Sequence, residues 1–333
     1  MSYIDNLNSL LSPAETAELL VIDLFAGCGG LSLGFRAAGF ATIGFEMLKD
    51  CVETYRANVG PCEEVVLTES SLYPSARVVI GGPPCQPYSV NGKQLGADDT
   101  RDGFRIFISA IERIQPEIWI FENVPGVFYR NSEYFESVMD ELKSLDYFIE
   151  SGVLNAAHFG VPQNRERIFV VGHRRSFSFP RPRNTVVTVG DALSTAKRAP
   201  RGSEFLTKSM DRYIARYEKA SCCVKPRDLR LNEPARTLTC RNLASATGDM
   251  LRLKVSGGRR RRLLVSEAAL LQSFPKWFAF SGSKFSQFNQ LGNAVPPLLA
   301  FAMAKQVRRY LKGRSFTREE VRALLLSEKR TRA

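Results

Sequence analysis

Cys85 is the first residue whose surroundings suggest chemistry. It follows Pro83 and Pro84 at the end of an apolar run, in the segment "VVIGGPPCQPYSVNGK". Two prolines fix the backbone just before the thiol, and ligands bind at strand ends in open α/β sheets. The polar, glycine-bearing stretch 86–103 is long enough to act as a moving lid. A free cysteine is more often a small buried apolar residue, but these features favour a nucleophile.

Two further segments place charged side chains at strand ends. "FENVPG" puts Glu122 at the end of an apolar strand, and "VPQNRERIFVVG" puts Arg165 and Arg167 just before another. In an extended segment, side chains two residues apart point to the same side, so both guanidinium groups would face one pocket. Glutamate and arginine at strand ends are often plain ion pairs. Their occurrence together with Cys85 on successive strands favours a shared active site.

A glycine-rich turn after the first predicted strand suggests a cofactor site. "DLFAGCGGLSLGF" begins at Asp23, and its glycines let the backbone approach a ligand at a helix N-terminus. Glu46 ends the second strand 19 positions after Gly27, a spacing that suits a carboxylate binding a ribose diol. The dinucleotide fingerprint requires a glycine where this chain has Ser32. A nicotinamide dinucleotide is therefore not favoured, and S-adenosylmethionine and a purely structural turn stay open.

The elements that must position these residues form an alternating pattern. Short apolar runs at 19–25, 41–46, 63–67, 77–82, 117–123 and 167–172 predict strands, and patterns such as 103–114 and 134–145 predict helices between them. We therefore expect an α/β fold with a mostly parallel, doubly wound sheet. "SPAE" (12–15) and "TREE" (317–320) should cap helices, and 266–274 and 296–311 should be helical.

The basic charge is concentrated in one segment. The chain of 333 residues carries a net charge of +12, and Arg174 to Arg262 holds 22 Lys+Arg against 7 Asp+Glu. The strand–helix alternation also fades there. We expect residues 1–172 and 263–333 to form one domain and 173–262 a smaller irregular or β-rich domain. A basic face on a nearly neutral body is typical of a protein that binds a polyanion, although a solvated surface is the alternative.

Composition also argues against several classes of protein. No apolar run approaches the ~20 residues of a membrane helix, and the N-terminus lacks the features of a signal peptide. The seven cysteines are unevenly spaced, no Cys-x-x-Cys pair occurs, and the histidines are His158 and His173. We therefore expect no disulfide framework, no metal site and no membrane partner, as suits a reducing cytoplasm.

Taken in order, these motifs resemble those of the C5-cytosine DNA methyltransferases. The matching segments span Asp23 to Pro297 and are "DLFAGCGGLSLGF", "GGPPCQPYS", "FENVPG", "PQNRERIF", "EPARTLT" and "QLGNAVPP". The resemblance implies a Rossmann-like, S-adenosylmethionine-dependent methyltransferase with a target recognition domain in 173–262. It implies that the catalytic residues are Cys85, Glu122, Arg165 and Arg167.

The resemblance also guides the binding residues that we expect. Those for S-adenosylmethionine are Asp23, Phe25, Ala26, Gly27, Gly29, Gly30, Leu31, Glu46, Met47, Glu69, Ser70, Gly82, Pro84, Asn293 and Ala294. Those for DNA are Gln86, Ser89, Arg236, Thr237, Arg241, Arg259 and Arg260. The run Arg259–Arg262 reads as a phosphate-binding stretch or a solvated turn. The chain departs from the family at "LTESSL", where a Gly-Asp usually meets the adenine, so Glu69 or Ser70 must serve, and at His158, where Asp or Asn is common.

The chemistry that the resemblance implies is methylation of cytosine C5 in a specific double-stranded DNA sequence. The Cys85 thiolate would add to C6, Glu122 and an arginine would stabilise charge developing on the ring, and the base would have to flip out of the duplex. The alternatives are a tRNA cytosine methyltransferase, a DNA-binding regulator without catalysis and a nicotinamide oxidoreductase. We expect a monomer in the cytoplasm, associated with the nucleoid, and a restriction endonuclease encoded nearby is a candidate partner.

Overall fold

The chain folds into two compact units. The computed structural model describes residues 1–13, 19–84, 102–126, 132–193, 198–220, 222, 227–244, 248–313 and 316–332. The sheet unit consists of Pro13–Leu154, Glu166–Arg181 and Ala300–Ala333, and the hairpin unit consists of Met1–Ser12, Asn155–Arg165 and Pro182–Leu299. This division differs from the predicted one, because residues 1–12, 155–165 and 263–299 group with most of the basic segment.

The sheet unit is built on a seven-stranded sheet of order β3-β2-β1-β4-β5-β8-β6. Its strands are β1 (Leu19–Leu24), β2 (Phe40–Glu46), β3 (Cys62–Glu64), β4 (Val78–Gly81), β5 (Ile118–Asn123), β6 (Phe148–Asn155) and β8 (Glu166–His173). β1 pairs in parallel with β2 and β4, β2 with β3 and β4 with β5, whereas β5 and β8 are antiparallel. The predicted mostly parallel sheet is confirmed, and β6 was not predicted.

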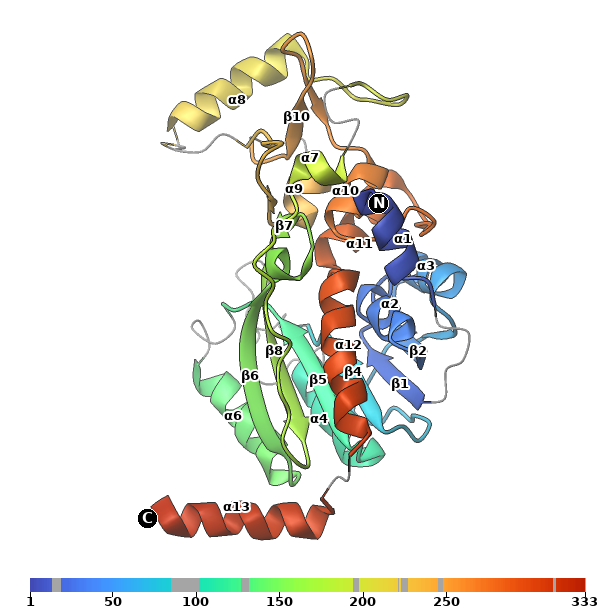
Figure 1. The fold of residues 1–333 in the computed structure, drawn as a ribbon, viewed down its shortest axis with the longest axis vertical. Coiled ribbons are helices and arrows are strands. Elements are labelled where there is room, and N and C mark those ends of the chain that lie inside the picture. The colour runs from blue at the N-terminus through green and yellow to red at the C-terminus, as the bar shows by residue number, and fades with distance from the viewer. Residues whose placement is uncertain are drawn as a thin grey trace. The chain divides into compact units, whose positions relative to one another are not determined.

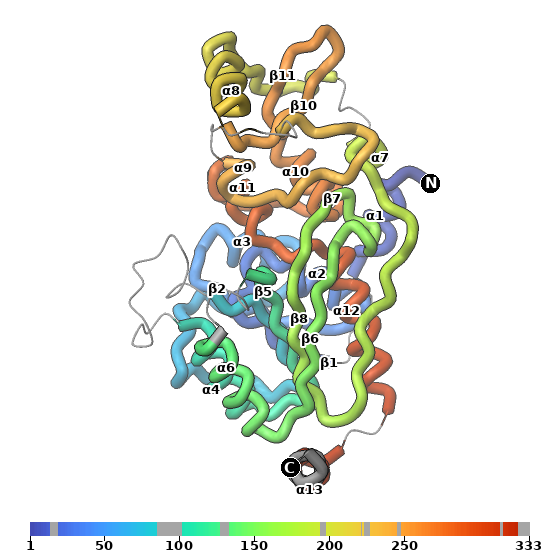
Figure 2. Tube along the Cα trace, turned by 90° about the vertical axis from the view of Figure 1, so that its left-hand side faces the viewer, coloured from blue at the N-terminus to red at the C-terminus, as the bar shows by residue number. Residues whose placement is uncertain are grey.

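Helices cover both faces of this sheet. They are α2 (Gly30–Ala37), α3 (Lys49–Asn58), α4 (Gly103–Ile114), α6 (Ser132–Ser144) and α12 (Pro297–Leu311), whereas α13 (Arg318–Arg332) lies below the strands in Figure 1. In Figure 2 the strands stand between α4 and α6 on one side and α12 on the other. One buried cluster joins α4 to the sheet through Phe107, Trp119 and Phe121. Long apolar residues on strands and helices thus supply the doubly wound core that the sequence predicted.

The hairpin unit consists of short elements joined by irregular chain. They are α1 (Tyr3–Leu10), the 3-10 helix η3 (Ala156–Phe159), β7 (Gln163–Asn164), α7 (Val189–Ala192), α8 (Lys208–Ala220), β9 (Ala235–Arg236), α9 (Cys240–Ala244), β10 (Arg252–Lys254), β11 (Arg260–Arg262), α10 (Val265–Leu271) and α11 (Lys284–Asn293). β7 pairs in parallel with β9, and β10 pairs antiparallel with β11. Figure 1 shows this hairpin beside α8.

One of the two predicted helix caps lies within the described residues. Thr317 and Glu320 exchange hydrogen bonds at the start of α13, as "TREE" predicted. The "SPAE" helix falls largely on residues outside the described ranges. The described helix that precedes β1 is α1, whose capping box is formed by Ser2 and Asp5. Short polar residues that accept backbone N–H groups therefore mark both helix starts.

The four consecutive arginines lie mainly in a strand and not in a solvated turn. Gly257 and Gly258 make the turn with positive φ angles, and Arg260–Arg262 then form β11. Arg261 is fully buried, and its two terminal nitrogens donate to the two carboxylate oxygens of Glu267 at 2.7 and 2.6 Å. Such a bidentate pair satisfies a guanidinium that has lost its water.

We expect Glu267→Gln to lower the free energy of unfolding by about 3 kcal/mol, because it leaves the Arg261 charge buried without a counter-charge. The matched control is Glu233→Gln, since Glu233 pairs with Arg230 where both side chains are about half exposed. That control should change stability by less than about 1 kcal/mol. Urea unfolding followed by circular dichroism measures both, and equal losses in the two variants would contradict the expectation.

Candidate active site

The turn after β1 adopts a backbone that glycine favours. Phe25, Gly27 and Gly29 have φ angles of 58°, 55° and 86°, and Gly29 precedes the first residue of α2. A Cβ on Gly29 would lie 2.8 Å from side-chain atoms of both Tyr55 and Val59, so packing requires this glycine. A Cβ on Gly27 would meet no atom within 4 Å. Among the described residues, the turn therefore leaves open space beside Gly27, where a ligand could approach the backbone.

Glu46 binds this turn to the end of β2. Its Oε2 accepts the Gly27 N–H at 2.9 Å, and its Oε1 accepts the N–H groups of Met47 and Leu48 at 2.9 and 2.8 Å. A carboxylate offers about four acceptor positions, so three amides leave capacity for a ligand hydroxyl. Met47 and Leu48 are 59% and 56% exposed, which is unusual for apolar side chains beside a buried carboxylate. Leu48 was not predicted, although an apolar pair directly after the strand-end glutamate is visible in "FEML".

Asp23 lies beneath the turn instead of facing open space. It is 1% exposed and accepts the Ser32 hydroxyl at 2.6 Å, and that hydroxyl in turn accepts the Tyr55 O–H at 2.8 Å. Burial raises the pKa of Asp23 from 3.8 to about 7, against the Ser32 hydrogen bond and with a smaller contribution from the charge of Glu46. Asp23 therefore makes a supporting contact to α2.

Glu69 and Ser70 lie in an exposed turn after β3. The Thr68 N–H donates to the Ser71 hydroxyl at 2.9 Å, which closes the turn, and Arg113 donates to the Glu69 carbonyl at 3.2 Å. Both predicted side chains are accessible from solvent. Either of them can reach a ligand, so the geometry leaves the choice between the two open.

The start of the proline loop is held by its neighbours. Gly82 donates to the Leu24 carbonyl at 3.3 Å, and the Asn123 side-chain amide donates to the Pro83 carbonyl at 3.0 Å. Pro84 packs so closely on Gly103 that a Cβ there would lie 2.3 Å from the proline ring. Cys85, Gln86 and Ser89 lie outside the described residues. The described part of the loop therefore fixes where the chain leaves the sheet.

Glu122 and Arg167 form an ion pair between the antiparallel strands β5 and β8. The Arg167 Nε lies 2.8 Å from the Glu122 Oε1, and the side chains are 12% and 10% exposed. Burial lowers the pKa of Arg167, and the charge of Glu122 opposes that shift. A Cβ on Gly82 would lie 3.8 Å from Glu122 Oε2, so this carboxylate lies beside the start of the proline loop. Two predicted catalytic residues are thus close to each other and to the backbone that leads to Cys85.

Arg165 has different partners from Arg167. It belongs to the hairpin unit, is 1% exposed, and donates to the carbonyls of Leu238 and Gly292 at 2.7 and 2.9 Å. Arg165 lies between β7 and β8, and its carbonyl accepts the Ala156 N–H at 2.9 Å. The structure therefore gives the two arginines separate surroundings, and Arg165 joins two segments within its own unit.

The remaining predicted cofactor residues divide between the two units. Phe25, Ala26, Gly30 and Leu31 lie in or next to the glycine turn of the sheet unit, whereas Asn293 and Ala294 belong to the hairpin unit. The Cys240 thiol donates to the Asn293 side-chain oxygen at 3.0 Å. The Asn293 side chain is therefore held by a contact within the hairpin unit.

The predicted DNA-binding residues that are described lie in the hairpin unit. Arg236 pairs with Asp249 at 3.3 Å, and the Thr237 hydroxyl donates to the Asn164 carbonyl at 2.7 Å. These two residues line a hollow of about 460 Å³ together with Arg227 and Arg230. The Arg241 side chain is exposed. The Arg259 guanidinium lies 3.6 Å from the centre of the Phe205 ring, and Arg260 pairs with Asp211 at 2.7 Å.

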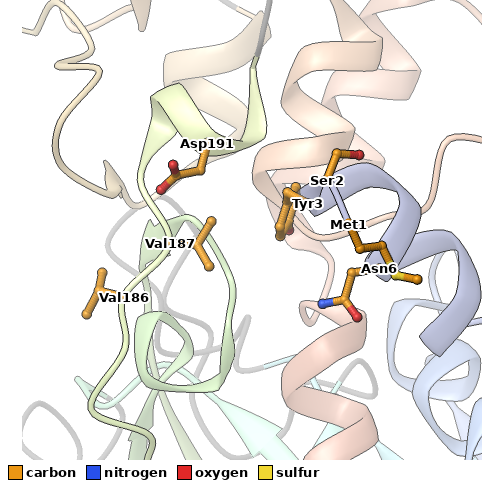
Figure 3. A pocket seen from close by; sticks show the side chains of 7 residues that line it. All are labelled: Met1, Ser2, Tyr3, Asn6, Val186, Val187 and Asp191. Carbon is orange, nitrogen blue, oxygen red and sulfur yellow. The ribbon is translucent and has the colours of Figure 1, made fainter.

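A second hollow in the hairpin unit contains none of the predicted site residues. Figure 3 shows it between α1 and the segment 186–191, lined by Met1, Ser2, Tyr3, Asn6, Val186, Val187 and Asp191. Its carboxylate, Asp191, accepts the Thr188 N–H and hydroxyl at 2.8 and 2.7 Å as part of the α7 cap. The polar groups of this hollow therefore serve local structure.

The described part of the chain has neither a metal-binding cluster nor a membrane-spanning helix. No cluster of three or more His, Cys, Asp or Glu side chains there could hold a metal ion. None of the helices described is both long and apolar enough to cross a membrane.

Comparisons with known proteins agree on one family. A model for the C-5 cytosine-specific DNA methylase family matches residues 19–309. The Type II methyltransferase M.AplI of Arthrospira platensis is 55% identical over 303 residues, covering 90% of this chain and 88% of that protein. M1.HphI of Haemophilus parahaemolyticus is 36% identical, covering 87% of each chain. The solved S. pombe Dnmt2 methyltransferase shares the fold with a TM-score of 0.69 at 16% identity, covering 89% of this chain and all of that one.

The buried Asp23 should make stability depend on pH. The folded state keeps a proton on Asp23 that the unfolded chain releases above its ordinary pKa of 3.8, so this contribution is complete below pH 3.8 and is lost as the pH rises through about 7. The loss can reach about 1.4 kcal/mol per pH unit. We expect Asp23→Asn to remove it, as measured by urea unfolding across this range.

The control for this prediction is Asp191→Asn. Hydrogen bonds from Thr188 lower the pKa of Asp191, so this control should weaken the protein at neutral pH and have no effect at low pH. The two variants therefore change the pH profile with opposite signs. Parallel profiles for the wild type and Asp23→Asn would contradict the part given to Asp23.

Proposed function

Because the chain belongs to the C-5 cytosine-specific DNA methylases, we propose that this DNA cytosine-C5 methyltransferase acts through a covalent bond from Cys85 to C6 of a flipped cytosine. The observation that carries the proposal is the Glu122–Arg167 pair beside the fixed start of the proline loop. It supplies a buried carboxylate and a guanidinium next to the backbone that leads to the thiol. A base inside a duplex cannot reach such a site, so flipping is required.

Each group has a defined part in the proposed reaction. The Cys85 thiolate forms the S–C6 bond, which makes C5 nucleophilic enough to accept a methyl group. Glu122 holds the N3 and N4 edge of the ring, where charge and hydrogen bonding change during addition. A base or water then removes the C5 proton, the S–C6 bond breaks, and the thiolate is restored. The Arg167 guanidinium keeps Glu122 in place and stabilises negative charge nearby.

The turn after β1 fits S-adenosylmethionine, which supplies an electrophilic methyl group when bound. We propose that open space beside Gly27 admits the ligand to the backbone, and that Glu46 accepts hydrogen bonds from its ribose hydroxyls. Met47 and Leu48 offer an exposed apolar surface to a flat ring. Glu69 or Ser70, Gly82 and Pro84 complete the proposed set in the sheet unit. Asp23 acts through Ser32 and α2 and does not touch the ligand.

The relatives suggest the biological setting. Two of them are named Type II methyltransferases, so we infer that this chain protects one duplex sequence from a cognate restriction endonuclease. The enzyme would then act as a monomer on the chromosome, in the cytoplasm of a prokaryote. Arg236, Thr237, Arg241, Arg259 and Arg260 are the proposed DNA contacts among the described residues, and of these Arg236 and Arg260 also pair with Asp249 and Asp211.

The nucleophile is tested by covalent trapping. With S-adenosylmethionine present, the wild type should form a stable adduct with duplexes containing 5-fluorocytosine, because fluorine at C5 prevents the final elimination. Cys85→Ser should form none and should lose at least about 10³-fold in labelled-methyl transfer, since the hydroxyl is a much weaker nucleophile. A gel that resolves protein–DNA adducts measures the first effect.

Two controls make the trapping result decisive. Cys240→Ser changes another cysteine and should still be trapped. Adducts formed by Cys85→Ser, or by wild type on tRNA and never on duplex DNA, would overturn the proposal. The tRNA result would instead favour a tRNA methyltransferase.

The cofactor site is tested with two glycines of matched backbone. Gly27 and Gly202 have φ angles of +55° and +84°, and a Cβ on either meets no atom within 4 Å. Both alanine variants should therefore lose about 1–2 kcal/mol of stability from the backbone alone. We expect only Gly27→Ala to weaken S-adenosylmethionine binding, by about tenfold or more, because its Cβ fills the ligand space. Equilibrium dialysis with labelled cofactor measures this, and equal affinities in the two variants would refute the assignment.

A further inference from the structure

One face of α8 carries a row of exposed cations. Lys208, Arg212, Arg216 and Lys219 follow one another at intervals of four, four and three residues, so they lie along one side of the helix. All four are exposed. Within the described ranges, no acidic side chain forms an ion pair with any of them. We call these four residues the α8 basic row.

The acidic residues of α8 flank this row and are bound by other arginines. Asp211 pairs with Arg260, and Glu218 pairs with Arg252, so both carboxylates are bound to the β10–β11 hairpin. Ile214 between them is fully buried. The helix is thus fixed to the hairpin by one face. On an ordinary solvated surface these carboxylates would neutralise the cations of α8, but here they pair with arginines of the hairpin.

We propose that the α8 basic row binds the phosphates of duplex DNA. The four residues span 11 positions, or about 16 Å of helix, and a duplex carries one phosphate per about 1.7 Å of its axis. This surface can therefore lie along several phosphates at once. Since the anchoring pairs hold α8 on the hairpin, the charges are presented without a folding step. This inference rests on the proposed function, because it takes DNA as the partner.

The chemistry of the α8 basic row favours phosphate contacts over base reading. Phosphate contacts from lysine and arginine position a protein on DNA and carry no sequence information. Each contact releases counterions, so binding weakens as salt rises, with a slope of about 0.9 per phosphate in a plot of log affinity against log salt concentration. The salt slope therefore reports phosphate contacts directly.

The experiment measures that slope for three proteins. Fluorescence anisotropy with a labelled duplex of arbitrary sequence, between about 50 and 200 mM salt, gives the slope for the wild type. The variant Lys208→Gln/Arg212→Gln/Arg216→Gln/Lys219→Gln should reduce it by about 2–4 and weaken cognate and non-cognate duplexes equally. The double variant Arg212→Gln/Arg216→Gln should reduce it by about 1–2, which preserves the test if the fourfold variant folds poorly.

The matched control removes two exposed cations at and just after the end of α12, in Arg309→Gln/Lys312→Gln, and should keep the wild-type slope. An α8 slope equal to that of this control overturns the proposal. So does a change confined to cognate DNA, which would mean base reading, or a reduced slope on single-stranded RNA with none on the duplex. Labelled-methyl transfer to DNA by the wild type is measured separately, so failure of the proposed function is distinguished from failure of the α8 basic row.

Discussion

The carboxylate of Glu46 is the constraint on which the glycine turn depends. It accepts one N–H from Gly27 and two from the residues that follow β2, so it ties together the ends of two neighbouring parallel strands. Hydrogen bonds to an ionised acceptor are stronger than neutral ones. They help to keep Phe25 at a φ angle of 58°, which an ordinary residue adopts only when its surroundings hold it there. The shape of the cofactor site thus follows from one strand-end side chain.

The second constraint is the cost of burying guanidinium groups. Arg165 is satisfied by two backbone carbonyls, and Arg261 by one carboxylate bound at both oxygens. Each buried arginine therefore takes acceptors from the protein, and the charge of Arg261 is also neutralised by Glu267. The net charge of the segment 174–262 therefore indicates that a polyanion can bind, but it does not locate the binding surface. The location follows from which cations have acid partners, and the structure provides that information.

The sequence predicted the parallel strands well because strands buried on both faces are apolar runs. β6 was missed because all its residues are half-buried or exposed, so no apolar run marks it. α4 was predicted at its observed bounds, since Asp102 caps it and apolar residues follow at helical spacing. The different surroundings of Arg165 and Arg167 could not be read from the sequence, because the carbonyls that bind Arg165 belong to Leu238 and Gly292, far along the chain. The pairs between α8 and the hairpin join residues far apart in the chain, which local patterns cannot reveal.

The Glu122–Arg167 pair also sets the starting state of the proposed reaction. A guanidinium at 2.8 Å favours the ionised form of the Glu122 carboxylate. An ionised Glu122 can accept the N4–H of an entering cytosine at once. Binding at N3 requires a proton on one of the two groups, so that proton must arrive with the base or from water while the Arg167 contact relaxes. The antiparallel pairing of β5 with β8 therefore determines where the carboxylate and the guanidinium of the proposed reaction meet.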